Sequence, residues 1–73
     1  MAGLPIISGR ECIDVLRKLG YVELRQRGSH VRLVCHGRPA VTVPLHAELD
    51  RGTLRSILRA VEVPVDDFIR LRG

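Results

Sequence analysis

The central part of the chain, residues 21–45, reads YVELRQRGSHVRLVCHGRPAVTVPL. Apolar and polar side chains alternate along it with a period of two, which is typical of strands with one buried face. Glycine-containing stretches at 28–29 and 37–39 interrupt the alternation, and glycine adopts the backbone angles that tight turns require. The segment therefore predicts an antiparallel meander of three strands, at residues 21–27, 30–36 and 40–45.

The alternation also predicts which side chains face the core. The apolar set is Val22, Leu24, Val31, Leu33, Cys35, Val41, Val43 and Leu45. Polar side chains alternate with this set and are expected on the opposite, open face of the sheet. The polar set includes Arg25, Arg27, His30 and Arg32. Pro44 has no backbone N–H, so we expect the third strand to end there or to lie at a sheet edge.

A helix is predicted before the first strand, from about residue 9 to residue 19. Ser8 and Glu11 have the spacing of a capping box, in which each side chain binds a free backbone N–H of the first turn. An apolar stripe with helical spacing follows, and Gly20 ends it. The stripe consists of Cys12, Val15, Leu16 and Leu19.

A second helix is predicted after the third strand, with Asp50 or Thr53 as its N-cap and Pro64 at its end. Its apolar stripe is Leu54, Ile57, Leu58 and Val61, and Arg51, Arg55 and Arg59 lie on the other face. A short last helix is expected from Asp66 onward. The predicted order is α-β-β-β-α with a helical tail. Because two apolar helix stripes need one apolar sheet face, we expect an α+β fold with the helices on one face of the sheet.

Length and composition limit the kind of protein this can be. Of 73 residues, 45% are hydrophobic and 27% are charged. These values are typical of a folded globular domain and exclude a disordered chain. We expect a single domain, residues 1–73, with one modest core. A deep, enclosed substrate cavity is excluded, so any active site must be shallow.

The charge indicates a polyanionic partner. Twelve Lys and Arg stand against eight Asp and Glu, a net charge of +4, and eleven of the twelve cations are arginine. The planar guanidinium group pairs with phosphate at two points. Nucleic acid is therefore a candidate partner. The charge by itself leaves open an acidic protein partner or a merely basic surface.

Cysteine usage and hydropathy predict the compartment. Cys12 and Cys35 lie among apolar residues and make no disulfide framework of the secreted kind, which indicates buried thiols in a reducing environment. The N-terminal residues lack the basic and apolar regions of a signal peptide. No apolar run approaches the ~20 residues that span a bilayer. We therefore expect a cytoplasmic protein without a membrane partner.

Three ordered segments resemble the HicA family of bacterial mRNA interferase toxins, which belong to type II toxin–antitoxin systems. They are RQRGSH at 25–30, VTVPLH at 41–46 and GTLRSIL at 52–58. The resemblance extends from about Ser8 to Val63. It implies a fold like that of double-stranded-RNA-binding domains (dsRBD-like), which agrees with the order derived above. It also implies cleavage of mRNA without a metal ion or cofactor, and a HicB-like antitoxin that covers the active site.

The resemblance assigns catalysis to His30, the residue directly after the Gly28-Ser29 turn. Many family members carry a second His next to it, where this chain has Val31. An imidazole exchanges protons near neutral pH. His30 would remove the proton of an RNA 2′-OH, whose oxygen then attacks the adjacent phosphorus. From the pattern alone, a solvated surface His without a task is the alternative.

Phosphate binding is expected of side chains near His30. Arg32 shares its face of the strand, and Arg25 and Arg27 lie across the hairpin. Their charges would hold the RNA phosphate and stabilise the charge that develops on it. Ser29 is a further candidate, as a hydrogen-bond donor to a phosphate oxygen, although its place in a turn explains it equally.

Other site chemistries are disfavoured. The cysteines and histidines have neither C-x-x-C nor H-x-x-x-H spacing, and Cys35 and His36 point to opposite faces of a strand, so no metal site is predicted. Thiols on apolar stripes are expected to be inert. His36 and His46 are expected to be surface residues.

Two other functions remain open. One is a dsRBD-like module that grips RNA by its shape and backbone without cutting it. The other is an interaction domain whose basic face binds an acidic protein. A cleavage assay separates a toxin from a binding module, and salt-dependent RNA binding separates the binding module from the interaction domain. One Tyr and one Phe leave little for base stacking, which indicates weak sequence preference.

Overall fold

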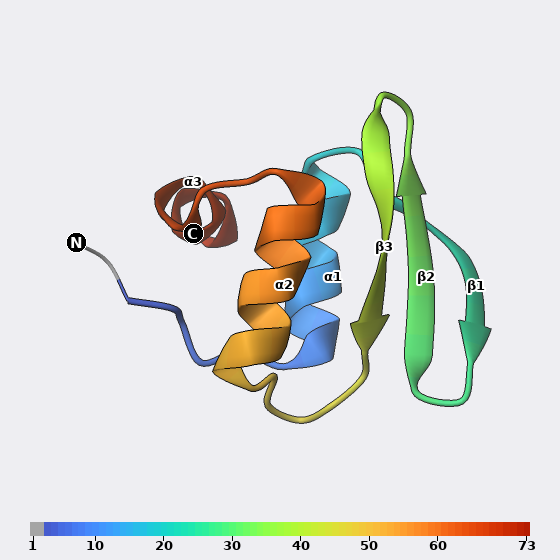
Figure 1. Ribbon diagram of the computed structural model, residues 1–73, viewed down its shortest axis with the longest axis horizontal. Coiled ribbons are helices and arrows are strands. Elements are labelled where there is room, and N and C mark those ends of the chain that lie inside the picture. Colours follow the sequence, from blue (N-terminus) through green and yellow to red (C-terminus); the bar gives the residue numbers. More distant parts are fainter. Residues whose placement is uncertain (1–2) are drawn as a thin grey trace.

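The computed structural model describes residues 3–73, and its elements follow the predicted order. The helices are α1 (Gly9–Lys18), α2 (Arg51–Val61) and α3 (Val65–Arg72), and the strands are β1 (Val22–Arg27), β2 (His30–Cys35) and β3 (Arg38–Pro44). The strands form an antiparallel sheet in the order β1-β2-β3. Both α1 and α2 lie on one face of the sheet, and α3 lies beyond them (Figure 1). The predicted α+β, dsRBD-like architecture is confirmed.

The hydrogen bonds at the helix starts explain where α1 and α2 begin. The Glu11 N–H donates to the Ser8 hydroxyl and the Ser8 N–H donates to the Glu11 carboxylate, both at 3.0 Å, which completes the capping box. At α2, the Thr53 N–H donates to the Asp50 carboxylate at 2.6 Å, so Asp50 rather than Thr53 is the N-cap. Local side-chain chemistry therefore sets both starts.

The expectation that Val22 and Leu24 face the core is wrong. Both side chains are 59% exposed. Glu23 between them turns toward the helices, and its carboxylate accepts from Arg10 at 3.3 Å and from Arg17 at 2.5 Å. Two ion pairs to α1 therefore orient the start of β1, and the apolar neighbours of Glu23 are left on the outside.

A β-bulge at Leu24 changes the face of the sheet on which the later side chains of β1 lie. Glu23 pairs with Leu33 of β2, and the next pair is Arg25 with Arg32, so Leu24 is the extra residue. Such a residue shifts every later side chain of its strand to the other face. After the bulge, the arginines of β1 lie on the open face of the sheet, as the sequence predicts.

The second turn is shorter than predicted. β2 ends at Cys35 and β3 begins at Arg38, which leaves His36 and Gly37 as the turn. Gly37 has φ +81°, a value that glycine adopts without strain. β3 ends at Pro44, as expected of a residue that cannot donate to a ladder.

The core lies between the sheet and the helices. Its sheet side consists of Val31, Leu33, Val41 and Val43, and its helix side includes Cys12, Leu16, Leu54, Ile57 and Phe68. Tyr21 is also buried, and its hydroxyl donates to the Pro39 carbonyl at 2.8 Å, which satisfies the polar group. Within residues 3–73, no helix has the length and apolar character needed to cross a membrane.

Candidate active site

The first hairpin brings the predicted site residues together. Gly28 has φ +55° in the two-residue turn, so Arg27 and His30 face each other as the first pair of the ladder. Two residues further along each strand, with regular pairing between them, Arg25 pairs with Arg32 on the same face of the sheet. Side chains directly opposite in an antiparallel pair have Cβ atoms about 4.5–5.5 Å apart. The turn and the regular pairing that follows it therefore place three guanidinium groups around one imidazole.

These side chains line a hollow on the open face of the sheet. The hollow has a volume of about 280 Å³ and is lined by Arg25, Arg27, His30, Arg32 and Thr42. All three strands contribute to it. This shallow shape agrees with the expectation from chain length, and it suits a polymer that lies across the surface.

Thr42 is a lining residue that sequence reasoning missed. It pairs with Arg32 across β2 and β3, and its hydroxyl accepts from the Arg32 guanidinium at 3.1 Å. This hydrogen bond orients Arg32 along the sheet. The alternation of the third strand indicates that Thr42 lies on the polar face of the sheet. That Arg32 is its partner follows only from the register of β2 and β3.

His30 is exposed, as predicted from its strand position. Across residues 3–73, no hydrogen bond to its imidazole occupies either ring nitrogen. Both nitrogens are therefore available for hydrogen bonds with a substrate, one as an acceptor and the other as a donor.

The charges around the hollow are uncompensated. In the described chain, Arg25, Arg27 and Arg32 make no ion pair with a carboxylate. In contrast, Arg10 and Arg17 pair with Glu23 on the other side of the sheet. Since no acidic residue lines the hollow among residues 3–73, its electrostatic potential is positive, which favours an anionic ligand.

Ser29 lies in the turn and does not line the hollow. Its carbonyl accepts from the Leu45 N–H at 2.6 Å, which ties the turn to the end of β3. This bond gives Ser29 a structural task beside His30. The structure does not bring its side chain together with the arginines.

The other two histidines lie apart from the hollow. His36 is exposed in the turn between β2 and β3, at the opposite end of β2 from His30. His46 follows β3 and is also exposed. The pKa of Asp50 lies below its ordinary range, chiefly because Thr53 donates to it, and the charge of nearby His46 lowers it further.

The thiols and acidic groups form no second centre in the described residues. Burial raises the pKa of the Cys12 thiol to about 12, so it stays protonated and unreactive. Cys35 is half-buried rather than buried, which departs from the expectation. No three His, Cys, Asp or Glu side chains within residues 3–73 lie close enough to hold a metal ion together.

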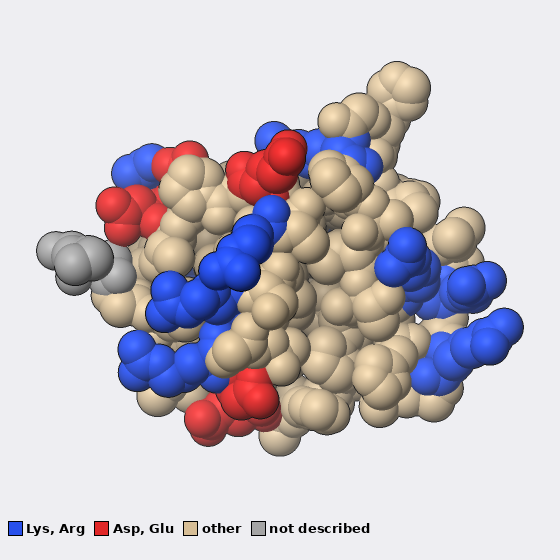
Figure 2. All heavy atoms as spheres, in the orientation of Figure 1, with Lys and Arg blue, Asp and Glu red and all other residues tan. Residues whose placement is uncertain are grey.

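A second group of arginines lies on the helix layer. Arg51, Arg55 and Arg59 are exposed on α2, and they line hollows shared with Pro64 and Val65. Figure 2 shows basic side chains over the helices on the left and, separately, at the sheet on the right. The basic surface is therefore divided, and the part on the sheet adjoins His30.

Comparison with known families gives a match over most of the chain. Residues 9–63 match the family described as HicA toxin of bacterial toxin-antitoxin. The match covers more than half of the chain and includes every residue that lines the hollow. A search of curated proteins found no match.

Proposed function

The chain belongs to the family of HicA toxins of bacterial toxin–antitoxin systems, and on that basis we propose that it is an mRNA interferase, a metal-independent endoribonuclease. The observation that carries this proposal is the hollow in which one exposed imidazole, His30, stands among three arginines without carboxylate partners in the described chain. We take residues 1–73 as a single toxin domain that acts on mRNA in the cytoplasm.

The proposed reaction uses the nucleophile that RNA carries. His30 accepts the proton of the 2′-OH, and the 2′-oxygen forms a bond to the adjacent phosphorus. The bond from phosphorus to the 5′-oxygen breaks, and that oxygen takes up a proton from water; the hydroxide that remains takes the proton from the His30 imidazolium and restores the base. The products are a 2′,3′-cyclic phosphate and a 5′-hydroxyl end.

One imidazole cannot both accept and donate a proton in a single concerted step. The negative charge on the phosphorane must therefore be stabilised by other groups. Arg27 and Arg32 flank His30 in the hollow. Preorganised positive charge at the place where negative charge develops is often the largest catalytic contribution. We assign Arg25, Arg27 and Arg32 to phosphate binding in the hollow, and we assign to Ser29 a hydrogen bond to a phosphate oxygen from the turn beside it.

A toxin–antitoxin system supplies a neutralising partner, and we propose a HicB-like protein. A shallow hollow on an open sheet face is easily covered by another protein. We expect the antitoxin to bury His30 and to place acidic groups against the three arginines, since charge complementarity guides such interfaces.

The test is a cleavage assay with the purified chain and a long, unstructured RNA, run with and without EDTA. We expect cleavage at the same rate in both, with cyclic phosphate and 5′-hydroxyl ends. Loss of cleavage on chelation, restored by Mg²⁺, would contradict the metal-free mechanism. Salt-sensitive binding without cleavage would leave the RNA-binding module as the function.

A further inference from the structure

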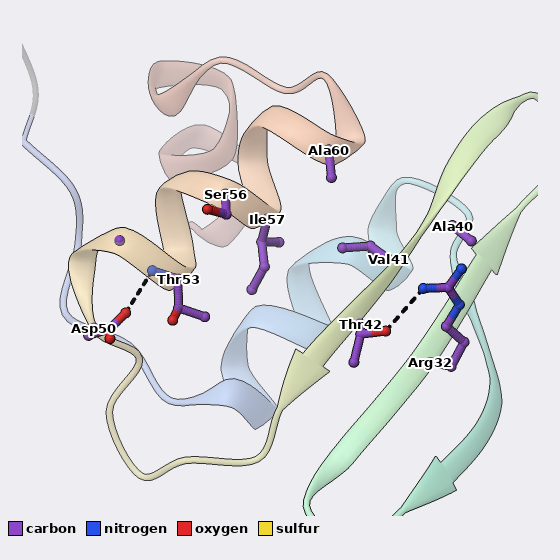
Figure 3. Close-up of a pocket in the computed structure, with 10 residues that line it drawn as sticks. Arg32, Ala40, Val41, Thr42, Asp50, Thr53, Ser56, Ile57 and Ala60 are labelled. Carbon is purple, nitrogen blue, oxygen red and sulfur yellow. Dashed lines mark hydrogen bonds between the residues drawn. The ribbon is translucent and has the colours of Figure 1, made fainter.

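A groove of about 700 Å³ runs between β3 and α2, outside the hollow that holds His30. Figure 3 shows Thr53, Ile57 and Ala60 on the α2 side of this groove, and Thr42 and Arg32 on the sheet side. The groove is open to solvent and is reached from the edge of the sheet that β3 forms.

The groove and the hollow meet at two residues. Arg32 and Thr42 line both of them, and the hydrogen bond of 3.1 Å between their side chains lies at the junction (Figure 3). An RNA whose scissile phosphate lies between His30 and Arg32 therefore presents a neighbouring nucleotide to the mouth of the groove.

The shape and charge of the groove suit a planar group better than a phosphate. Ala40 and Ala60 have short side chains and Gly52 has none, which leaves room for a flat group. At the end away from Arg32 stands Asp50 (Figure 3). Its negative charge repels a phosphate group but not an uncharged base.

Hydrogen-bonding groups line the same groove. The hydroxyls of Thr42, Thr53 and Ser56 each donate or accept. One oxygen of Asp50 accepts from the Thr53 N–H at 2.6 Å, and a carboxylate retains further acceptor capacity on its other oxygen. Carboxylates accept from the exocyclic amino groups of bases. Proteins recognise the sequence of single-stranded RNA mainly through hydrogen bonds to the edges of bases that are turned out of the stack.

We propose that the groove between β3 and α2 binds the base of the nucleotide next to the scissile phosphate, and that it prefers a base with an exocyclic amino group. This inference rests on the proposed ribonuclease function. It adds a base preference to a site whose arginines contact phosphates, which carry no sequence information. Hydroxyls and a carboxylate provide this preference in a chain with few aromatic residues.

The test blocks the groove with Ser56→Leu. Ser56 is an exposed residue of the groove lining, so a leucine there narrows the groove at its solvent side without overpacking the core. The matched control is Ala47→Leu, which places the same side chain in the exposed loop before α2, outside the groove lining. Each protein cleaves an RNA pool with randomised positions, and the product ends are sequenced. We expect a wild-type preference at one position beside the cut, reduced about tenfold by Ser56→Leu and retained by Ala47→Leu.

Affinity for an uncleavable RNA gives a second readout. The probe carries a 2′-deoxynucleotide at the cut site and the preferred base beside it. Ser56→Leu should bind it about tenfold more weakly, with an unchanged salt dependence because the phosphate contacts persist. Suppose that the wild type cleaves RNA and that Ser56→Leu shows the same base preference and the same affinity. The groove then does not bind a base, and the proposed ribonuclease function is unaffected.

The remaining outcomes distinguish a failure of the base-binding proposal from a failure of the proposed ribonuclease function. If the wild type cleaves no RNA, the ribonuclease function fails, and selection of bound sequences from the same randomised pool by wild type and Ser56→Leu decides whether the groove binds a base. If Ser56→Leu weakens antitoxin binding but leaves RNA affinity intact, the groove is an antitoxin surface and the proposal is wrong.

Discussion

Arg27 and His30 face each other across the first hairpin, with only the Gly28-Ser29 turn between them. A guanidinium group at this position lies within reach of any phosphate that contacts the imidazole, since opposed side chains in such a pair are about 4.5–5.5 Å apart at Cβ. The pairing depends on the turn length, because one inserted residue would move Arg27 to the other face of the sheet.

Replacing His30 with Ala should abolish most of the cleavage. The side chain is exposed, so its removal leaves no cavity in the core. We expect the rate to fall by about 10²–10⁴-fold, the typical contribution of a general acid or base. Stability should change far less than the about 2–5 kcal/mol of a core truncation. Single-turnover cleavage rates and thermal unfolding of the folded variant measure both quantities.

His36→Ala and His46→Ala are the matched controls for that substitution. Both histidines are exposed and lie outside the hollow. Their loss should leave the cleavage rate close to that of the wild type. If the folded His30→Ala protein cleaves RNA at the wild-type rate, His30 is not a catalytic residue. If His36→Ala or His46→Ala loses as much of the cleavage rate as His30→Ala, the catalytic role cannot be assigned to His30 alone.

Arg32→Ala should reduce the salt dependence of RNA binding. Each phosphate neutralised on a single strand contributes a slope of about −0.7 to the plot of log affinity against log salt. Loss of Arg32 should therefore flatten the slope by roughly one such contact. Arg59→Ala, which removes the same charge from the outer side of α2, should leave the slope unchanged. Binding that does not depend on salt would exclude the basic hollow as the RNA surface.

Gly9→Ala should destabilise the fold. A Cβ at Gly9 would lie 1.9 Å from the carbonyl oxygen of Pro44, a backbone atom at the end of β3. The start of α1 would have to move away from the sheet, and overpacking of this kind costs about 1–3 kcal/mol. Denaturant unfolding measures the loss.

Gly52→Ala is the control for Gly9→Ala. Its Cβ would have Asp50 Oδ1 as nearest neighbour, at 4.0 Å. Because alanine is favoured over glycine inside a helix, this variant should be at least as stable as the wild type. Equal stability of the two variants would show that α1 does not pack against Pro44 as described.

The Cys12 thiol should resist alkylation in the folded protein. Burial raises its pKa from 9.0 to about 12, so under mildly alkaline labelling conditions almost none of it is thiolate. Cys35 retains exposed surface and should be labelled first. Mass spectrometry after a short treatment with iodoacetamide distinguishes the two sites. Rapid labelling of Cys12 without denaturant would contradict its burial.

The same thiol should make the fold sensitive to alkali. The unfolded chain releases the Cys12 proton near pH 9.0, whereas the folded chain holds it up to about 12. The stabilising contribution is therefore complete below the lower value and is lost as pH rises between the two. Cys12→Ala should show a weaker decline of unfolding free energy over this range. Parallel declines in the two proteins would assign the effect to other groups.

Expression of the chain alone should arrest bacterial growth, and co-expression of its antitoxin should restore it. The antitoxin is expected to cover the hollow around His30, so that RNA is excluded. His30→Ala should permit growth while still binding the antitoxin, because the arginines remain. A folded wild-type chain that is harmless when overexpressed would argue against the cleavage of mRNA proposed here.

Much of this structure follows from local sequence alone. Ser8 and Glu11 specify the start of α1 through hydrogen bonds within one helical turn. The Gly28-Ser29 turn and the period of two then bring His30 to the open face of the sheet beside arginines. Such features depend on residues a few positions apart, so a linear pattern is sufficient to predict them.

Tertiary structure decided the features that depend on distant residues. Glu23 turns toward α1, where Arg10 and Arg17 pair with it, and the bulge after it accompanies the exposure of Val22 and Leu24. No pattern within β1 contains that information, since the energy comes from another element. Two further features depend on contacts between distant segments. Thr42 contacts Arg32 only because β2 and β3 pair in this register, and the groove forms only because α2 packs beside β3. A linear pattern contains neither the register nor the packing.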